Sequence, residues 1–270
     1  VEGKRLCDIG AISTEGEKFH STSRAKFVAL AENYRFLCGH NIIAHDLKYI
    51  GGDLANRNIN PEFIDTLLIS PLLFPEVSHH NLIKDDKLQT GDINNPLSDA
   101  IKSRDLFFEE VSRFNMLPEA LKQIYCSLLY DVEGFRGFFN YLGCIPHADT
   151  EKLVREGLKG DICENAELTS FVNFNPLELA YVLSLIKSEE DPAVIPPWVI
   201  RNYPKTYLIL NKLRNTPCRE GCAFCASHFN TRVKLKEYFG YDSFRLYNGE
   251  PLQERAADAA VHGRSLLAIF

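Results

Sequence analysis

The sequence predicts an α/β fold for its first part, because strand-like and helix-like patterns alternate along the chain. Residues 6–13 predict a short strand, and residues 25–35 have the spacing of an amphipathic helix. Residues 36–45 predict a buried strand with a turn at residues 39–41, and a helix is expected to begin near Asp46. Alternation of this kind is typical of an α/β sheet.

The segment that follows completes this unit. Residues 64–69 predict a further strand or the beginning of a helix, which Pro71 and Pro75 end. Apolar residues then recur at helical spacing over residues 97–114. We therefore expect one α/β domain at residues 1–115.

The next stretch, residues 116–215, predicts helices and no clear strand. The strongest helices are expected at residues 118–142, with a break near Gly134 and Gly137, and at residues 176–188. Each begins with a proline, which suits the first position of a helix. No recognisable catalytic or metal-binding pattern occurs in this stretch, so we interpret it as a helical connector.

The composition excludes several classes of protein. The 270 residues are 45% apolar, enough for one or two domains with a core, and they are neither disordered nor collagen-like. We find no apolar run long enough to span a membrane and no secretory signal, so we expect a soluble, cytoplasmic protein. The chain begins with Val1 and ends in an apolar run at residues 265–270, so we expect a fragment of a longer protein.

The charge is distributed unevenly. Residues 1–200 contain 19 basic and 30 acidic side chains, a net charge of −11, whereas residues 201–270 contain 11 and 6, a net charge of +5. The acidic first part fits a metal site built from carboxylates, and the basic last part fits a segment that binds phosphate. A solvent-exposed basic surface with no such partner would explain the charge of the last part equally well.

Two acidic residues lie where helices begin. Asp46 follows the predicted strand and its Gly39-His40-Asn41 turn, and Asp99 lies in the first turn of the helix that begins near Pro96. A carboxylate in such a place can cap the helix or hold a divalent cation at the edge of the sheet.

On these motifs, residues 1–115 resemble the DEDD superfamily of 3′ to 5′ exonucleases, which have a ribonuclease H-like fold. The second motif of the family, Gly-His-Asn followed by Asp, is matched by residues 39–46, its Asp-Thr-Leu-Leu strand by residues 65–68, and its last motif by residues 94–100. The resemblance implies that Asp46 and Asp99 bind Mg²⁺ or Mn²⁺. Two such ions activate water and stabilise the leaving oxygen of a phosphodiester.

The sequence departs from the family in two ways. The first motif, Asp-x-Glu on the opening strand, would lie before Asp8, so we expect this chain to lack it. Asn94 occupies the position of the general-base histidine, and an amide does not transfer a proton near neutral pH. His79 or His80 is an alternative base. We therefore expect catalysis in the parent protein and none in this chain.

A cluster of cysteines predicts a metal site. Cys218, Cys222, Cys225 and His228 have the spacing C-x3-C-x2-C-x2-H, which suits tetrahedral Zn²⁺. The same spacing occurs in the three-cysteine motif of radical SAM enzymes, so an iron–sulfur cluster and a site without metal stay open as alternatives. We interpret the other cysteines as buried, inert thiols: Cys7, Cys38, Cys126, Cys144 and Cys163.

The last residues contain a further motif. Residues 235–245, with Gln253 beyond them, resemble the adenine-recognition motif of RecQ-type DNA helicases. The resemblance implies that Tyr241 stacks on adenine, that Arg245 supports it and that Gln253 pairs with its edge, so that the full-length parent binds ATP. The gap between Arg245 and Gln253 is longer than is usual in that family.

Together these motifs predict a fragment of a DNA-repair helicase that acts on DNA, at single-stranded 3′ ends. We expect an exonuclease-like domain at residues 1–115, the connector at 116–215, a zinc knuckle at 216–230 and the start of a RecA-like domain at 231–270. The alternatives are a catalytically inactive nucleic-acid-binding module and, more remotely, a radical SAM protein.

Overall fold

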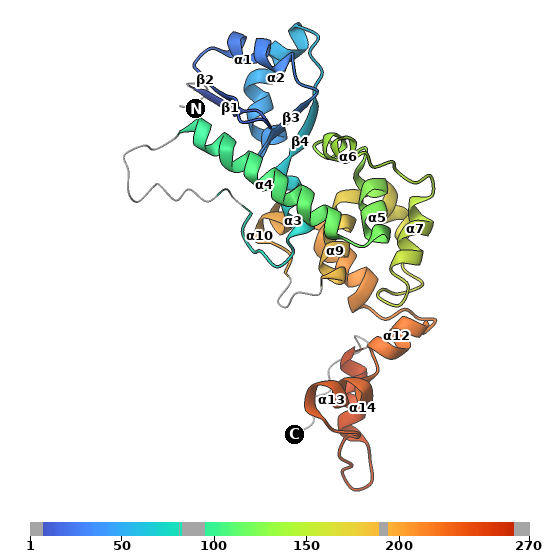
Figure 1. Ribbon diagram of the computed structural model, residues 1–270. Helices are drawn as coiled ribbons and strands as arrows, with labels where there is room; N and C mark the ends of the chain where they lie inside the picture. The colour runs from blue at the N-terminus through green and yellow to red at the C-terminus, as the bar shows by residue number, and fades with distance from the viewer. Residues whose placement is uncertain (1–7, 81, 83–94, 189–193, 262–270) are drawn as a thin grey trace.

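The computed structural model describes residues 8–80, 82, 95–188 and 194–261 (Figure 1). Its strands are β1 (Ile9–Ile12), β2 (Lys18–Ser21), β3 (Phe36–Gly39) and β4 (Glu62–Asp65). The helices that accompany them are α1 (Arg24–Ala31), α2 (Leu47–Asn56), α3 (Thr66–Leu73) and α4 (Pro96–Met116), with a π-helical turn, η1 (Ile42–Asp46), before α2. The rest of the chain is helical: α5 (Glu119–Leu129), α6 (Arg136–Leu142), α7 (Thr150–Gly157), α8 (Leu168–Phe174), α9 (Pro176–Lys187), α10 (Pro197–Asn202), α11 (Lys205–Leu210), a second π-helical turn η3 (Asn211–Asn215), α12 (Ala223–His228), α13 (Thr231–Phe239) and α14 (Leu252–Val261).

The prediction of a mixed α/β fold followed by helices is confirmed. Within the described residues the strands form two small sheets: β1 pairs antiparallel with β2, and β3 pairs parallel with β4. The connection from β3 to β4 passes through α2, as a parallel pair requires. The strand predicted before the turn at residues 39–41 is β3, which ends at Gly39 because Asn41 has the left-handed backbone angle φ of 68° and a π-helical turn follows it. The strand is half-buried to exposed, and not buried as predicted.

Helix α4 links the strands to the helical block. Figure 1 shows it as a long helix that runs from the β1–β2 hairpin to α5 and α9. Its first turn lies so close to β1 that a Cβ atom added at Gly10 would be 2.3 Å from the backbone nitrogen of Leu97. Its later turns bury Phe107 and Phe114 in the larger core.

The larger hydrophobic core continues from Ile64 on β4 through the helical block to Cys225 on α12. Helix α9 is its centre, because consecutive residues from Leu179 to Leu183 are almost completely buried. Each fully buried leucine side chain in such a core contributes about 1.5–3 kcal/mol to folding. The core therefore holds the helical block and the beginning of the C-terminal part together.

The predicted break in the first connector helix is confirmed. Helix α5 ends at Leu129, and α6 begins at Arg136. Gly134 has a φ of 89°, which favours glycine, and a Cβ atom at Gly137 would lie 2.7 Å from the carbonyl oxygen of Phe63. Both glycines thus let the chain pass close against β4.

The last helices extend away from the block (Figure 1). Helix α13 packs on α14 through the ion pair of Arg232 with Glu254 and the hydrogen bond from Thr231 Oγ1 to Asp258 Oδ1, 2.6 Å long. Neither helix buries a residue. The apolar run at residues 265–270 lies outside the described residues. Among the described helices, none has the length and apolar character needed to cross a membrane.

Candidate metal centre

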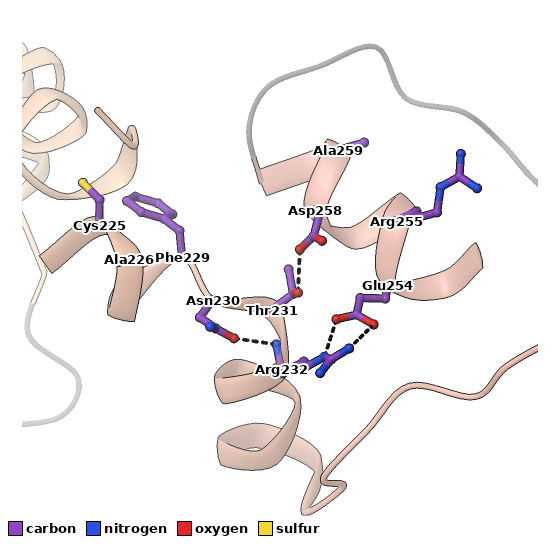
Figure 2. A pocket seen from close by; sticks show the side chains of 10 residues that line it. All are labelled: Cys225, Ala226, Phe229, Asn230, Thr231, Arg232, Glu254, Arg255, Asp258 and Ala259. Carbon is purple, nitrogen blue, oxygen red and sulfur yellow. Dashed lines mark hydrogen bonds and ion pairs between the residues drawn. The ribbon is translucent and has the colours of Figure 1, made fainter. Parts of the chain in front are cut away.

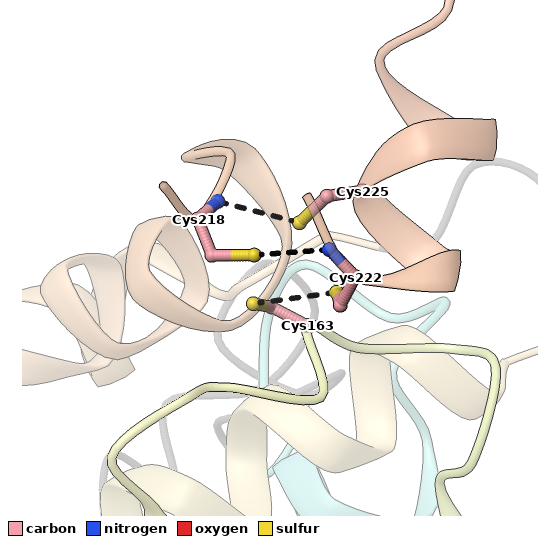
Figure 3. Close-up of side chains that lie close together, drawn as sticks. All are labelled: Cys163, Cys218, Cys222 and Cys225. Atoms are coloured by element: carbon pink, nitrogen blue, oxygen red, sulfur yellow. Dashed lines mark hydrogen bonds between the residues drawn. The ribbon is translucent and has the colours of Figure 1, made fainter. Parts of the chain in front are cut away.

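Four cysteine side chains meet where the helical block joins the C-terminal part (Figure 3). The sulfur atoms of Cys163, Cys218, Cys222 and Cys225 all lie within 4.8 Å of one another. The Sγ atoms of Cys163 and Cys222 are 3.9 Å apart. Among the described residues, these four are the only group of three or more potential metal ligands at such distances.

The local sequence explains how the three close cysteines converge. Cys218 precedes a tight turn in which Gly221 has a φ of 65°, a conformation that favours glycine. Cys222 is the N-cap residue of α12, and Cys225 lies in the first turn of that helix. The turn and the helix start therefore aim three thiols at one point.

The fourth thiol comes from a distant segment. Cys163 lies in the connection between α7 and α8, and its backbone N–H donates to the carbonyl oxygen of Leu213 over 2.7 Å. This hydrogen bond holds the connection against the end of η3, just before Cys218. The pairing therefore brings Cys163 to the thiols of a loop 55 residues further along the chain.

N–H groups surround the sulfur atoms. The backbone N–H of Cys222 donates to Cys218 Sγ over 3.3 Å, and the side-chain amide of Asn165 donates to the same sulfur over 3.4 Å. The backbone N–H of Cys218 donates to Cys225 Sγ over 3.4 Å. Hydrogen bonds to a thiolate stabilise its negative charge, and those from Cys222 and Asn165 lower the pKa of Cys218 to about 6. Burial raises the pKa of Cys163 and Cys225.

These distances fit a single tetrahedral metal ion. With a Zn–S bond of about 2.3 Å, the sulfur atoms of a tetrahedral zinc site are about 3.8 Å apart. The 3.9 Å between Cys163 and Cys222 agrees with that edge. The cluster of thiolate donors suits Zn²⁺, a metal that prefers sulfur ligands and tetrahedral geometry.

The structure places Cys163, and not His228, beside the three predicted cysteines. On α12, residues four apart lie side by side, and the imidazole of His228 stacks on the Phe224 ring with centroids 4.7 Å apart. Cys163 is buried, as expected, but it lies among three other thiols. It is a lone cysteine without local spacing, so the sequence carries no sign of its role.

The remaining cysteines differ in their surroundings. Cys126 is buried, as expected, whereas Cys144 is half-buried and Cys38 is exposed, so the prediction was wrong for Cys38. Cys38 lies on β3, a strand of a two-stranded sheet, and such a strand leaves one face or edge uncovered. Cys7 lies outside the described residues.

The two predicted metal-binding carboxylates lie in different surroundings. Asp46 ends the η1 turn with about half of its side chain exposed, and its Oδ1 is 3.4 Å from Nδ1 of His45. Asp99 is half-buried in the first turn of α4, where that helix packs against β1. Neither belongs to a group of three close ligand side chains in the described part of the chain. Asn94, the residue at the general-base position, lies outside the described residues.

A third acid, Asp65, has a structural role. Its buried carboxylate accepts hydrogen bonds from the backbone N–H groups of Asn41 (2.8 Å), Ile43 (3.1 Å) and Leu67 (3.0 Å). It thereby caps α3 and holds the turn that follows β3. Burial raises the pKa of Asp65, and the N–H groups oppose that rise.

The histidines near this turn are held by hydroxyl groups. Nδ1 of His40 is 3.0 Å from Thr66 Oγ1, and Nδ1 of His80 is 2.7 Å from Ser70 Oγ. Burial, with a contribution from His80, lowers the pKa of His40 to about 4, and burial also lowers the pKa of His80. Both imidazoles are therefore neutral at pH 7.

The residues of the adenine-recognition motif lie at the surface. Tyr241, Arg245 and Gln253 are all exposed. The nearby open cleft, with a volume of about 710 Å³, lies between α12, α13 and α14 (Figure 2). The three motif residues are not among those that line it, which are Cys225, Ala226, Phe229, Asn230, Thr231, Arg232, Glu254, Arg255, Asp258 and Ala259.

Comparison of the chain with protein-family models, with curated proteins and with solved structures yields no match.

Proposed function

We propose that Cys163, Cys218, Cys222 and Cys225 hold one structural Zn²⁺ ion. The observation that carries this proposal is the convergence of their four sulfur atoms within 4.8 Å. Four protein thiolates fill the coordination shell of zinc and leave no position for a substrate, which is typical of a structural site. Zinc bound there ties the connection after α7 to the start of α12.

The same geometry favours zinc over an iron–sulfur cluster. The thiolates of a four-iron cluster bind different iron atoms and so lie farther apart than the 3.9 Å between Cys163 and Cys222. A radical SAM cluster uses three cysteines, whereas four converge here. In the cytoplasm, where we place this protein, thiols stay reduced and are free to bind metal.

Metal analysis of anaerobically purified protein tests this proposal. We expect one zinc per chain, no acid-labile sulfide and no visible absorption band. If the protein contains iron and sulfide in stoichiometric amounts, the four cysteines bind an iron–sulfur cluster and the zinc proposal is wrong. Protein with no bound metal after purification in the presence of zinc would contradict the metal site altogether.

At the level of the whole protein, we propose that the chain is part of a DNA-repair protein in which a 3′ to 5′ exonuclease-like domain precedes a RecQ-type helicase. The arrangement at β3 supports this proposal. Gly39 pairs with Asp65 at the carboxyl end of the two parallel strands, and Asp46 follows there, a common place for a ligand site in α/β folds. Mg²⁺ or Mn²⁺ would bind Asp46 and Asp99, and ATP in the full-length parent would bind Tyr241, Arg245 and Gln253.

One observation favours the alternative of a nucleic-acid-binding module that positions single-stranded DNA for the helicase. In this sequence Asn94 occupies the position of the general-base histidine of the family. An amide does not transfer a proton near neutral pH. We therefore propose that this chain binds single-stranded DNA without cutting it.

The experiment is digestion and binding of a 3′-labelled single strand with Mg²⁺ or Mn²⁺. We expect binding and no shortening of the strand. Shortening that Asp46→Ala and Asp99→Ala both abolish would show that this chain is a nuclease. Failure to bind DNA at any salt concentration would contradict the proposed role in nucleic-acid processing.

A further inference from the structure

A basic surface leads from the helical block to the metal centre. Helix α11 and the turn η3 follow one another without a break, and the loop from residue 216 to Cys218 continues from them. Between residues 194 and 219 the sequence has five basic side chains and no acidic one. We call the exposed side of α11–η3 the basic face; its residues are Lys205, Tyr207, Leu208, Lys212 and Arg214.

The burial pattern shows which way this face points. Thr206, Ile209 and Leu213 have 0%, 1% and 0% of their surface exposed and pack into the larger core. Lys205, Tyr207, Leu208 and Lys212 are exposed, and Arg214 is half-exposed. Because the core lies against one side of the helix, the exposed side chains lie on the opposite side. The cations therefore stand on the surface that faces away from α9.

The cations of the basic face differ from several others in the described part of the chain. Arg35, Arg155 and Arg232 each form an ion pair with a glutamate. No ion pair of Lys205, Lys212 or Arg214 occurs within the described residues. Their charges are thus not neutralised by neighbouring carboxylates, and the surface attracts anions.

Beyond η3 the charges are mixed. Burial, and then the charges of Arg214 and Lys234, hold the pKa of the His228 imidazole below the ordinary value, whereas Glu237, which pairs with Lys234, acts in the opposite direction. The His228 ring stacks on Phe224 and contacts Phe229 edge to face, with centroids 4.7 Å and 5.0 Å apart. The hydrogen bond from the N–H of Cys163 to the carbonyl oxygen of Leu213 anchors η3 to the connection between α7 and α8.

We propose that the basic face binds the backbone of single-stranded nucleic acid, with Lys205, Lys212 and Arg214 contacting phosphates and Tyr207 stacking on a base. This proposal rests on the nucleic-acid binding proposed above. It assigns that binding to a surface that lies outside all of the sequence motifs. One feature favours a single strand. Tyr207 has 63% of its surface exposed between the cations, and only an unpaired base can stack on such a ring.

The test is the salt dependence of binding, measured by fluorescence anisotropy with a labelled 30-nucleotide oligo-dT and the full 270-residue chain. The variant carries Lys205→Gln, Lys212→Gln and Arg214→Gln. Each phosphate contact to a single strand contributes about 0.7 to the slope of log K against log salt. We expect the slope to fall by about 2, so that between 50 and 200 mM salt the variant loses about 20-fold less affinity than the parent chain does.

A matched control carries Arg136→Gln, Lys152→Gln and Lys159→Gln, which remove the same charge from exposed positions of the helical block. This control is expected to bind with the parent slope. Tyr207→Ala is expected to weaken binding about fivefold or more at constant slope, and Tyr207→Phe to restore it. Zinc content and thermal unfolding of each variant verify that the fold is intact.

Two outcomes overturn the proposal. One is that the triple variant has the same slope of log K against log salt as the parent chain, while the parent chain binds DNA. In that case the chain binds nucleic acid, but not through the basic face. The other is equal competition by polyglutamate and by oligo-dT, which would make the surface a general site for acidic polymers. The same anisotropy measurement with labelled oligo-rU determines whether RNA binds to the same site. If the parent chain binds neither oligonucleotide, the proposed nucleic-acid role itself fails.

Discussion

The backbone N–H of Cys163 donates to the carbonyl oxygen of Leu213 over 2.7 Å, and this hydrogen bond joins two parts of the chain that the sequence separates. It brings the thiol of Cys163 to the loop that contains Cys218 and Cys222. The metal centre therefore depends on tertiary packing as much as on the cysteine spacing.

Replacement of Cys163 is expected to weaken zinc binding. Cys163→Ser should reduce zinc affinity at least 10-fold and lower the thermal unfolding temperature, because a hard hydroxyl replaces one of four soft thiolate ligands. The measurement is zinc competition with a chromophoric chelator, followed by a thermal scan. Cys38→Ser, which changes an exposed cysteine outside the cluster, is the control. If His228→Ala loses zinc and Cys163→Ser does not, His228 is the fourth ligand after all.

Glu110 is expected to make stability depend on pH. Its side chain is fully buried, and both carboxyl oxygens lack a hydrogen-bond partner within the described residues. Burial, together with the charges of Asp65 and Glu109, raises the pKa of Glu110 well above its ordinary value. A group of this kind contributes most stability below its unfolded pKa, and that contribution falls as the pH rises toward the folded pKa.

The variant Glu110→Met removes the buried carboxyl and with it the loss of stability at higher pH. We therefore expect Glu110→Met to raise the free energy of unfolding at pH 7 and to flatten its pH dependence, because no carboxyl then has to be buried. A buried polar group without a hydrogen-bond partner costs about 1–3 kcal/mol, which sets the expected size of the gain. Urea unfolding at pH 5 and pH 7 measures both effects. Glu133→Gln, at an exposed position whose charge does not act on Glu110, should change neither, and an unaltered pH profile in Glu110→Met would show that the carboxyl is paired.

Loss of the Asp65 carboxylate is expected to destabilise the turn after β3. In Asp65→Ala the N–H groups of Asn41, Ile43 and Leu67 lose their acceptor, and each buried donor without a partner costs about 1–3 kcal/mol. We expect a total loss of about 3 kcal/mol in urea unfolding, and a smaller loss in Asp65→Asn, which keeps one carbonyl oxygen. Asp53→Ala, which breaks the exposed pair with Arg24, should cost less than about 1 kcal/mol. Equal stability of Asp65→Ala and the parent chain would contradict this role.

Gly10 is expected to tolerate no side chain. A Cβ atom there would lie 2.3 Å from backbone atoms of Pro96 and Leu97, so Gly10→Ala must move α4 away from β1. We expect a loss of about 2 kcal/mol, within the usual cost of overpacking. Gly52→Ala on α2 is the matched control, because its Cβ meets open space, and alanine in a helix adds about 0.5–1 kcal/mol. Thermal unfolding of the two variants should move in opposite directions, and a neutral Gly10→Ala would show that α4 and β1 are loosely packed.

Some local features could be predicted because neighbouring residues determine them. The break between α5 and α6 follows from Gly134 and Gly137, whose small size permits the turn and the close approach to β4. The turn after the strand at residues 36–39 could be predicted in the same way, from Gly39-His40-Asn41. What holds this turn is the distant carboxylate of Asp65, which accepts hydrogen bonds from the N–H groups of Asn41 and Ile43. The apolar pattern alone carries no sign of that long-range hydrogen bonding.

The sequence by itself determined the mixed α/β and helical character of the chain and the convergence of Cys218, Cys222 and Cys225, since periodicity and short spacing act within one or two turns of the backbone. Only the tertiary structure decided that Cys163 completes the four-cysteine cluster and that His228 stacks on Phe224 instead. The same holds for the basic face, because the outward direction of Lys205 and Lys212 depends on which side of α11–η3 packs into the core. Ligands and surfaces of this kind are built from segments that meet only when the core forms, and no local pattern specifies such a meeting.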